Sequence, residues 1–243
     1  NGLFFDETAP AHGNAGFVTL SVTDVGAYSG SLMQGTKKYS FSGRLDLDGR
    51  ATNNVALGKT NIVRLELAVN LAATLKRVTG RIFASAWQAS LLAEQAGFAA
   101  PASSPFAGAY TYNFLGSDLP AEPAGDGYAT AAVAATGAAT LPGMLADGTK
   151  ISQKVAVTRG DLWPVYVSLY SGKGSLFGWL AFSNTPPHNT VYGNLQWTKP
   201  ALPSSKLYPA GFAFSVGAFG SRYTAPAAGV RVLELTNAVL AFE

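Results

Sequence analysis

The aromatic side chains of the second half of the chain offer the clearest potential for ligand binding. They are Trp163, Tyr166, Tyr170, Trp179, Tyr192, Trp197, Tyr208 and Tyr223. Aromatic faces stack on the C–H surfaces of sugar rings, and the polar group of Tyr or Trp reaches hydroxyls. Because Trp163 follows a turn and Trp197 precedes Lys-Pro, we expect both to be exposed. The sequence therefore predicts a ligand-binding set of Trp163, Tyr166, Tyr170 and Trp197.

Core packing is the competing interpretation of these aromatic residues. Alternating aromatic residues in a β domain usually fill its interior, and we expect Trp179, which lies between leucines, to do so. The two interpretations differ in a measurable way at Trp163. An exposed Trp163 predicts that Trp163→Ala abolishes glycan binding and leaves the melting temperature nearly unchanged, whereas a large loss of stability would place it in the core.

An acidic loop is the second candidate site. Asp118, Glu122 and Asp126 lie in one stretch rich in Pro and Gly. Carboxylate oxygens on a loop are ligands that Ca²⁺ prefers, so the sequence predicts a calcium site there. The stretch lacks the EF-hand spacing, and a solvated loop without metal is the alternative.

Catalytic and transition-metal sites have little support. The chain has no cysteine, and its histidines are His12 and His188, both in predicted loops. No Gly-x-Ser-x-Gly motif is present, so a hydrolytic triad lacks its usual elements. Several aspartates adjoin glycine, where they stabilise turns. We expect a protein that is not an enzyme and has no cofactor other than calcium, with a carbohydrate-active enzyme as an alternative.

An internal duplication specifies the elements that must position these residues. The segment 30–37 returns as 143–150, with both glycines, the leucine and the final Thr-Lys at the same spacing. Three further pairs of segments are similar: 16–26 with 127–137, 78–82 with 191–195, and 107–112 with 210–214. The chain is therefore expected to contain two related units.

Period-two alternation and turn dipeptides such as Asp-Gly predict antiparallel meanders. The expected strands lie near 17–23, 26–33, 37–46, 62–70, 77–84 and 109–115 in the first unit, and near 128–134, 138–145, 150–157, 165–170, 176–183, 190–198, 211–217 and 231–242 in the second. Residues 86–96 have helical spacing and are the best helix candidate, with a segment that begins as a strand as the equal alternative. The fold class predicted is all-β, with two units of about six strands each.

The domain boundary is expected in the Pro-rich stretch 120–127, which gives one unit over 1–120 and another over 121–243. The two units could form two barrels side by side or the two sheets of one sandwich. The length of the segment between them favours two barrel-like units that pack together.

Composition limits the classes of partner. The chain of 243 residues is 48% hydrophobic and 13% charged, and its 17 basic residues are scattered. That scatter does not form the basic stripe that phosphate neutralisation needs, so nucleic acid is not expected as a partner. No apolar run approaches the length of a membrane helix.

Several motifs resemble those of a module found in large multidomain bacterial secreted and surface proteins. They are Asn1–Phe5, Gly26–Gly30, Tyr39–Gly43, Gly125–Tyr128, Leu145–Lys150, Trp163–Tyr166, Leu169–Ser175 and Trp197–Pro200. The resemblance covers nearly the whole chain and includes no catalytic motif. It implies an extracellular or bacterial cell-surface location. The Gly-x-Tyr-x-Gly strand is also similar to the barrels of transferrin-binding surface proteins, at the level of fold only.

The predicted function is that of a non-catalytic extracellular module that binds a polysaccharide or a partner protein. A structural stalk or filament subunit that self-associates through its sheets is the alternative from another class.

Overall fold

The computed structural model describes residues 1–70, 75–185, 188–231, 237 and 239. Its regular structure is β, apart from two short 3₁₀ turns, η1 (His12–Asn14) and η2 (Tyr170–Gly172). The strands of the first sheet are β1 (Gly2–Phe5), β2 (Gly16–Val22), β3 (Ala27–Gln34), β4 (Lys37–Arg44), β5 (Arg50–Ala56), β6 (Ile62–Val69), β7 (Arg77–Phe83) and β8 (Gln88–Glu94). Those of the second are β9 (Gly108–Phe114), β10 (Gly127–Val133), β11 (Ala139–Met144), β12 (Lys150–Lys154), β13 (Leu162–Leu169), β14 (Gly174–Thr185), β15 (His188–Lys199) and β16 (Phe212–Tyr223).

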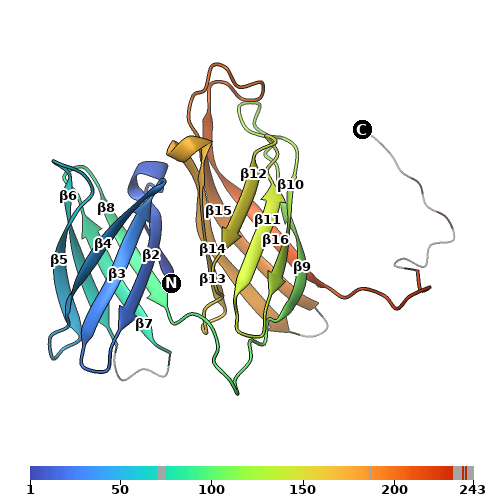
Figure 1. The fold of residues 1–243 in the computed structure, drawn as a ribbon. Helices are drawn as coiled ribbons and strands as arrows, with labels where there is room; N and C mark the ends of the chain where they lie inside the picture. Colours follow the sequence, from blue (N-terminus) through green and yellow to red (C-terminus); the bar gives the residue numbers. More distant parts are fainter. Residues whose placement is uncertain (71–74, 186–187, 232–236, 238, 240–243) are drawn as a thin grey trace.

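Each sheet has eight strands and curls into a nearly closed barrel (Figure 1). Consecutive strands pair antiparallel, and the first strand of each sheet also pairs with the last, β1 with β8 and β9 with β16. The prediction of an all-β fold with two related barrel-like units is therefore confirmed. We call the unit built from β1–β8 barrel 1 and the unit built from β9–β16 barrel 2.

Three details of the expected organisation are wrong. The strand expected near 109–115 is β9, which belongs to barrel 2, so the units divide between β8 and β9 rather than at residue 120. Each unit has eight strands rather than six. The helix candidate is β8, because Ala89, Leu91 and Ala93 point into the barrel with strand periodicity. The strand expected over 231–242 falls mainly outside the described residues.

The internal repeat corresponds to equivalent places in the two barrels. Residues 16–22 and 127–133 form the second strands, residues 30–37 and 143–150 the third hairpins, and residues 78–82 and 191–195 the seventh strands. The fourth repeat pair is the exception, because 107–112 enters a first strand and 210–214 a last one. Three of the matched segments thus give a residue-by-residue correspondence between the barrels.

A side-chain amide bridges the opening in each barrel. No ladder among the described strands joins β4 to β5 or β12 to β13. In barrel 2, the Gln153 amide donates to the Pro164 carbonyl at 2.7 Å and accepts from the Tyr166 N–H at 2.6 Å. In barrel 1, the Asn53 amide donates to the Ser42 carbonyl at 2.9 Å. Each amide takes the place of a peptide group in the missing ladder.

The barrels pack together through a small apolar cluster. Leu3 and Phe17 project outward from β1 and β2 and meet Tyr166 and Phe177, which project outward from β13 and β14. The Tyr166 hydroxyl accepts a hydrogen bond from the Gly35 N–H at 2.7 Å. Because these residues of both barrels are buried, the contact between the barrels lies in the interior of the molecule.

Polar contacts flank the apolar cluster. His12 lies 3.0 Å from the Ser175 hydroxyl through Nδ1 and 3.0 Å from the Gly172 carbonyl through Nε2. Glu94, whose side chain is fully buried, pairs with Arg77 and accepts from the Thr158 hydroxyl of barrel 2 at 2.8 Å. These contacts fix the orientation of one barrel on the other.

Candidate functional site

The two tryptophans expected at the surface lie in the core of barrel 2. Trp163 is 0% exposed and Trp197 is 2% exposed. Trp163 begins an inward-facing series on β13 with Val165 and Val167, and its indole N–H donates to the Val155 carbonyl at 2.9 Å. Their expected exposure is therefore wrong, because strand alternation decides the direction of a side chain even beside a turn.

Tyr166 and Tyr170 lie in two other environments. Tyr166 is buried between the barrels, where burial raises the pKa of its hydroxyl to about 12. Tyr170 lies in η2, at one end of barrel 2. The four aromatic residues predicted to bind a ligand therefore do not share one surface.

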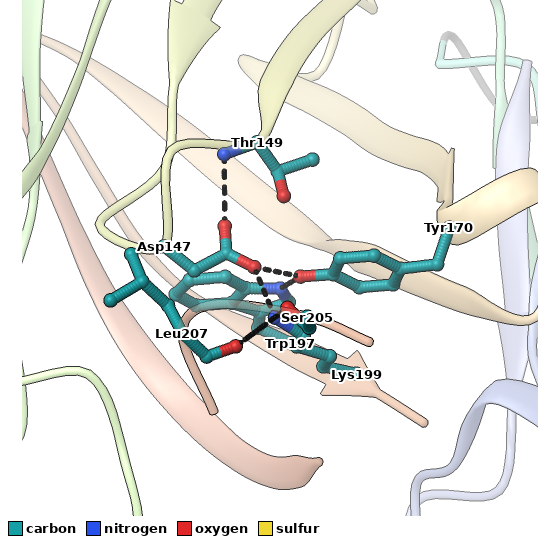
Figure 2. Close-up of polar contacts among 7 residues, drawn as sticks. All are labelled: Asp147, Thr149, Tyr170, Trp197, Lys199, Ser205 and Leu207. Atoms are coloured by element: carbon teal, nitrogen blue, oxygen red, sulfur yellow. Dashed lines mark hydrogen bonds and ion pairs between the residues drawn. The ribbon is translucent and has the colours of Figure 1, made fainter. Parts of the chain in front are cut away.

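Tyr170 belongs to a buried polar network that Figure 2 shows around Asp147 and Lys199. The Asp147 carboxylate accepts from the Tyr170 hydroxyl at 2.8 Å and from the Lys199 ammonium at 3.2 Å. The side chains of Asp147 and Lys199 are only 1% and 3% exposed. The Trp197 indole N–H donates to the Tyr170 hydroxyl at 3.0 Å, which links the network to the core.

The Lys199 ammonium is saturated by its neighbours. Besides Asp147, it donates to the Ser205 hydroxyl at 3.0 Å and to the Leu207 carbonyl at 2.7 Å (Figure 2). Three acceptors match the three N–H groups of an ammonium, so each of its donors has a partner. The network pins the segment between β15 and β16 across the end of barrel 2.

The Asp147 carboxyl is held in its ionised form. Burial raises its pKa, but hydrogen bonds from Thr149, Tyr170 and Lys199 together outweigh burial and bring the pKa below its ordinary value. Burial and the neighbouring Asp147 charge raise the pKa of the Tyr170 hydroxyl, which stays neutral and donates.

This depressed pKa predicts a loss of stability in acid. The contribution of the Asp147 carboxylate is complete above the pKa of an unfolded aspartate, about 3.9, and is lost as pH falls through the lower pKa of the folded state. Urea denaturation of wild type and Asp147→Asn between pH 7 and pH 2 measures this. The difference between their unfolding free energies is expected to shrink below about pH 4. A difference that stays constant over that range would contradict the assignment.

The acidic loop does not bring its three carboxylates together. Asp126 accepts from the Asn113 amide at 2.7 Å and the Gly116 N–H at 2.8 Å, whereas Glu122 accepts from the Ser117 hydroxyl at 2.6 Å. Within the described residues no group of three or more acidic, His or Cys side chains could hold a metal ion. Asp126 and Glu122 instead order the loop that leads into β10.

A different set of aromatic residues lies at the surface of barrel 2. Tyr192, Phe219 and Tyr128 are 50%, 54% and 60% exposed. Strand pairing aligns them in one row: Tyr192 is opposite Phe219, Phe219 is opposite Asn113, and Asn113 is opposite Tyr128. Directly paired side chains point to the same side of a sheet, with Cβ atoms about 5 Å apart. We call this row, on the outer face of β15, β16, β9 and β10, the aromatic face.

A row of hydroxyls lies beside the aromatic row. Two residues further along each strand, Thr190, Ser221, Thr111 and Thr130 are paired in the same order. Neither row contains a charged residue. The Asn113 amide is oriented by its bond to Asp126, which leaves its carbonyl as an acceptor among the rings. The face therefore combines apolar ring surface with neutral donors and acceptors.

The corresponding row of barrel 1 is mainly apolar and partly covered. It runs through Thr79, Leu92, Leu3 and Phe17, which are paired in the same way. Leu3 and Phe17 are 1% and 9% exposed because they pack on barrel 2. The equivalent row of barrel 2, which is exposed, has Asn113 in the place of Leu3 and Tyr128 in the place of Phe17. The uncovered row thus has hydrogen-bonding groups at the two positions where the covered row has Leu3 and Phe17.

Sequence reasoning included Tyr192 among the aromatic residues but not in the binding set, and it passed over Phe219, Tyr128 and Asn113. A signal was present in the repeat, where Tyr128 matches Phe17. The row itself could not be recognised, because its members come from four strands and meet only through register.

Comparison with protein-family models, with curated proteins and with solved structures finds no match. Among the described residues, no helix has the length and apolar character needed to cross a lipid bilayer.

Proposed function

We propose that this chain is a non-catalytic binding module of an extracellular or cell-surface protein, and that the aromatic face of barrel 2 binds an uncharged polysaccharide. The observation that carries the proposal is the exposed row of Tyr192, Phe219 and Tyr128 beside a row of neutral hydroxyls. Ring faces pack on the C–H surface of a pyranose, and hydroxyls and amides exchange hydrogen bonds with its hydroxyl groups.

The difference between the two barrels supports a hydrated ligand rather than a dry protein contact. At the contact with barrel 2, the row of barrel 1 contains Leu3 and Phe17. The uncovered row has an amide and a phenol at these positions, and such groups are costly to bury without partners. A polyhydroxylated ligand supplies those partners.

Self-assembly through the same kind of interface is disfavoured by barrel 1. Val78 of barrel 1 is equivalent to Val191 of barrel 2, so their partners Val69 and Phe182 are equivalent as well. At the same distance back along these two strands, barrel 1 has Arg64 where barrel 2 has Phe177. In the same register Asn54 occupies the place of Tyr166. Arg64 also pairs with the exposed Glu66 at 3.2 Å. A second copy would meet charges where the existing contact has apolar rings.

Binding to a panel of insoluble neutral polysaccharides, namely cellulose, chitin, xylan and granular starch, tests the proposal. Wild type is expected to bind at least one of them, and Phe219→Ala and Tyr192→Ala each to bind it about tenfold or more weakly, since tenfold corresponds to about 1.4 kcal/mol. Both variants are expected to unfold within about 0.5 kcal/mol of wild type, because their side chains are exposed.

Ile62→Ala is the matched control, because Ile62 is 61% exposed on the outside of barrel 1. It is expected to bind as wild type does. Absence of wild-type binding to every polysaccharide in the panel, or undiminished binding by both aromatic variants, would overturn the proposal.

A further inference from the structure

Residues 95–107, which connect β8 to β9, form the linker between the barrels. The end of barrel 1 that adjoins this linker contains a cavity of about 570 Å³. In Figure 1 this is the lower end of the blue barrel, where β2 and β8 end and β7 begins. Its walls are inward-facing aliphatic side chains from four strands: Leu20, Val22, Val69, Val78 and Ala93. Asp24, Lys76 and Gln95 line its polar rim. A volume of a few hundred cubic ångström at a barrel mouth is typical of small-molecule sites.

The same end of barrel 2 is filled by aromatic rings. Phe106, in the linker that precedes β9, is 4% exposed and lies 4.8 Å from Phe182, ring centre to ring centre. Tyr110 lies 5.4 Å from Phe182 and donates its hydroxyl hydrogen to the Phe106 carbonyl at 2.8 Å. The linker is fixed over this end by the Ser104 N–H, which donates to the Ala135 carbonyl at 2.8 Å.

The strand registers show which residues account for the difference. Val78 and Val191 are equivalent in the repeat, and their partners on the preceding strands are Val69 and Phe182. On the other side, Val78 is paired with Ala93, which is paired with Gly2. In barrel 2, Val191 is paired with Gly220, which is paired with Tyr112. Gly2 and Tyr112 are therefore equivalent positions.

Barrel 1 therefore has valine and glycine where barrel 2 has two large rings. The described part of the chain also places no ring at the mouth of barrel 1 as Phe106 is placed in barrel 2. The hollow follows from these substitutions and not from the geometry of the barrel, because the same strand order closes over a packed interior in barrel 2.

The lining defines the class of occupant. The buried side-chain polar atoms without a partner within the described residues, those of Tyr112, Ser168 and Thr198, all lie in barrel 2. The aliphatic side chains of the cavity wall offer apolar contact, and Asp24, Lys76 and Gln95 place polar groups at the rim. A group that fills it gains dispersion contacts that the lining otherwise lacks, whereas a polar end remains at the rim.

We propose that the mouth of barrel 1 binds a small amphipathic molecule through an apolar group about the size of a phenyl ring. Its bound ring occupies the space that Phe106 and Phe182 fill in barrel 2, and its polar end lies near Asp24, Lys76 and Gln95. This site is independent of the aromatic face, which lies on the outside of the other barrel.

Titration of the full chain with the uncharged fluorescent probe N-phenyl-1-naphthylamine tests the proposal. Wild type is expected to bind one probe per chain with enhanced emission. Val69→Phe restores the ring that barrel 2 has at this position and is expected to weaken probe binding at least tenfold. Val78→Phe fills the cavity from the adjacent strand, is expected to have the same effect, and decides the outcome if the first variant does not fold.

Phe219→Ala is the matched control, because it removes an exposed ring from the aromatic face and leaves barrel 1 untouched. It is expected to bind the probe as wild type does. Hydrogen exchange of wild type with saturating probe gives a readout without substitution, with added protection expected at the ends of β2, β6 and β8. Absence of probe binding, loss of binding in Phe219→Ala, or protection confined to barrel 2 would each overturn the proposal.

Discussion

Lys199→Met is expected to lower the free energy of unfolding by about 3 to 5 kcal/mol, because it leaves the Asp147 carboxylate buried without its cation. Methionine keeps the aliphatic packing of the lysine stem, so the loss measures the charge and its hydrogen bonds. Three of the four tryptophans lie in barrel 2, and their fluorescence during urea denaturation reports its unfolding.

Lys150→Met is the control for this measurement. Lys150 begins β12 close to Asp147 in the sequence but is exposed, and its substitution is expected to change stability by less than about 0.5 kcal/mol. The double variant Asp147→Asn with Lys199→Met is expected to be less destabilised than the sum of the single variants, because neither group is then left as an unpaired charge. Additive effects would show that the two groups are not coupled.

Trp163→Ala is expected to destabilise barrel 2 by about 3 to 5 kcal/mol, as for other fully buried aromatic residues. The substitution leaves a cavity beside Tyr112 and Phe182, whose rings lie 6.3 and 6.1 Å from the indole. It also removes the indole bond to the Val155 carbonyl, which bridges the opening between β12 and β13.

This result distinguishes the core from the surface interpretation of the aromatic residues. Tyr192→Ala, at a half-exposed position, is expected to leave the melting temperature nearly unchanged. If Trp163→Ala instead retained the stability of wild type, Trp163 would not be part of the packed interior. The comparison uses thermal unfolding of the two variants under identical conditions.

Local patterns predicted the strands and their turns well. The turn at Gln34-Gly35 and the strand expected near 26–33 that precedes it were predicted from alternation and glycine, and both are present, as are their counterparts in barrel 2. These features depend on neighbouring residues and on positive φ, as at Gly35, where φ is 58°.

Pairings between distant segments could not be predicted in the same way. The segment 108–114 was assigned to the first unit because nothing in its own residues indicates that its partner is β16. The aromatic face is likewise a product of register across β15, β16, β9 and β10. The burial of Trp163, in contrast, could have been inferred from its alternation with Val165 and Val167.

The order of strands has a consequence for how the chain folds. Among the described strands, every ladder in each barrel joins consecutive strands except one, β1 with β8 or β9 with β16. Hairpins form from residues close in the chain, whereas the exceptional ladder requires closure of a loop that includes almost the whole barrel. Since each barrel is a continuous stretch of sequence, neither needs the strands of the other to complete its sheet. We therefore expect the meeting of first and last strands, which converts an open curved sheet into a barrel, to be the slow step in folding.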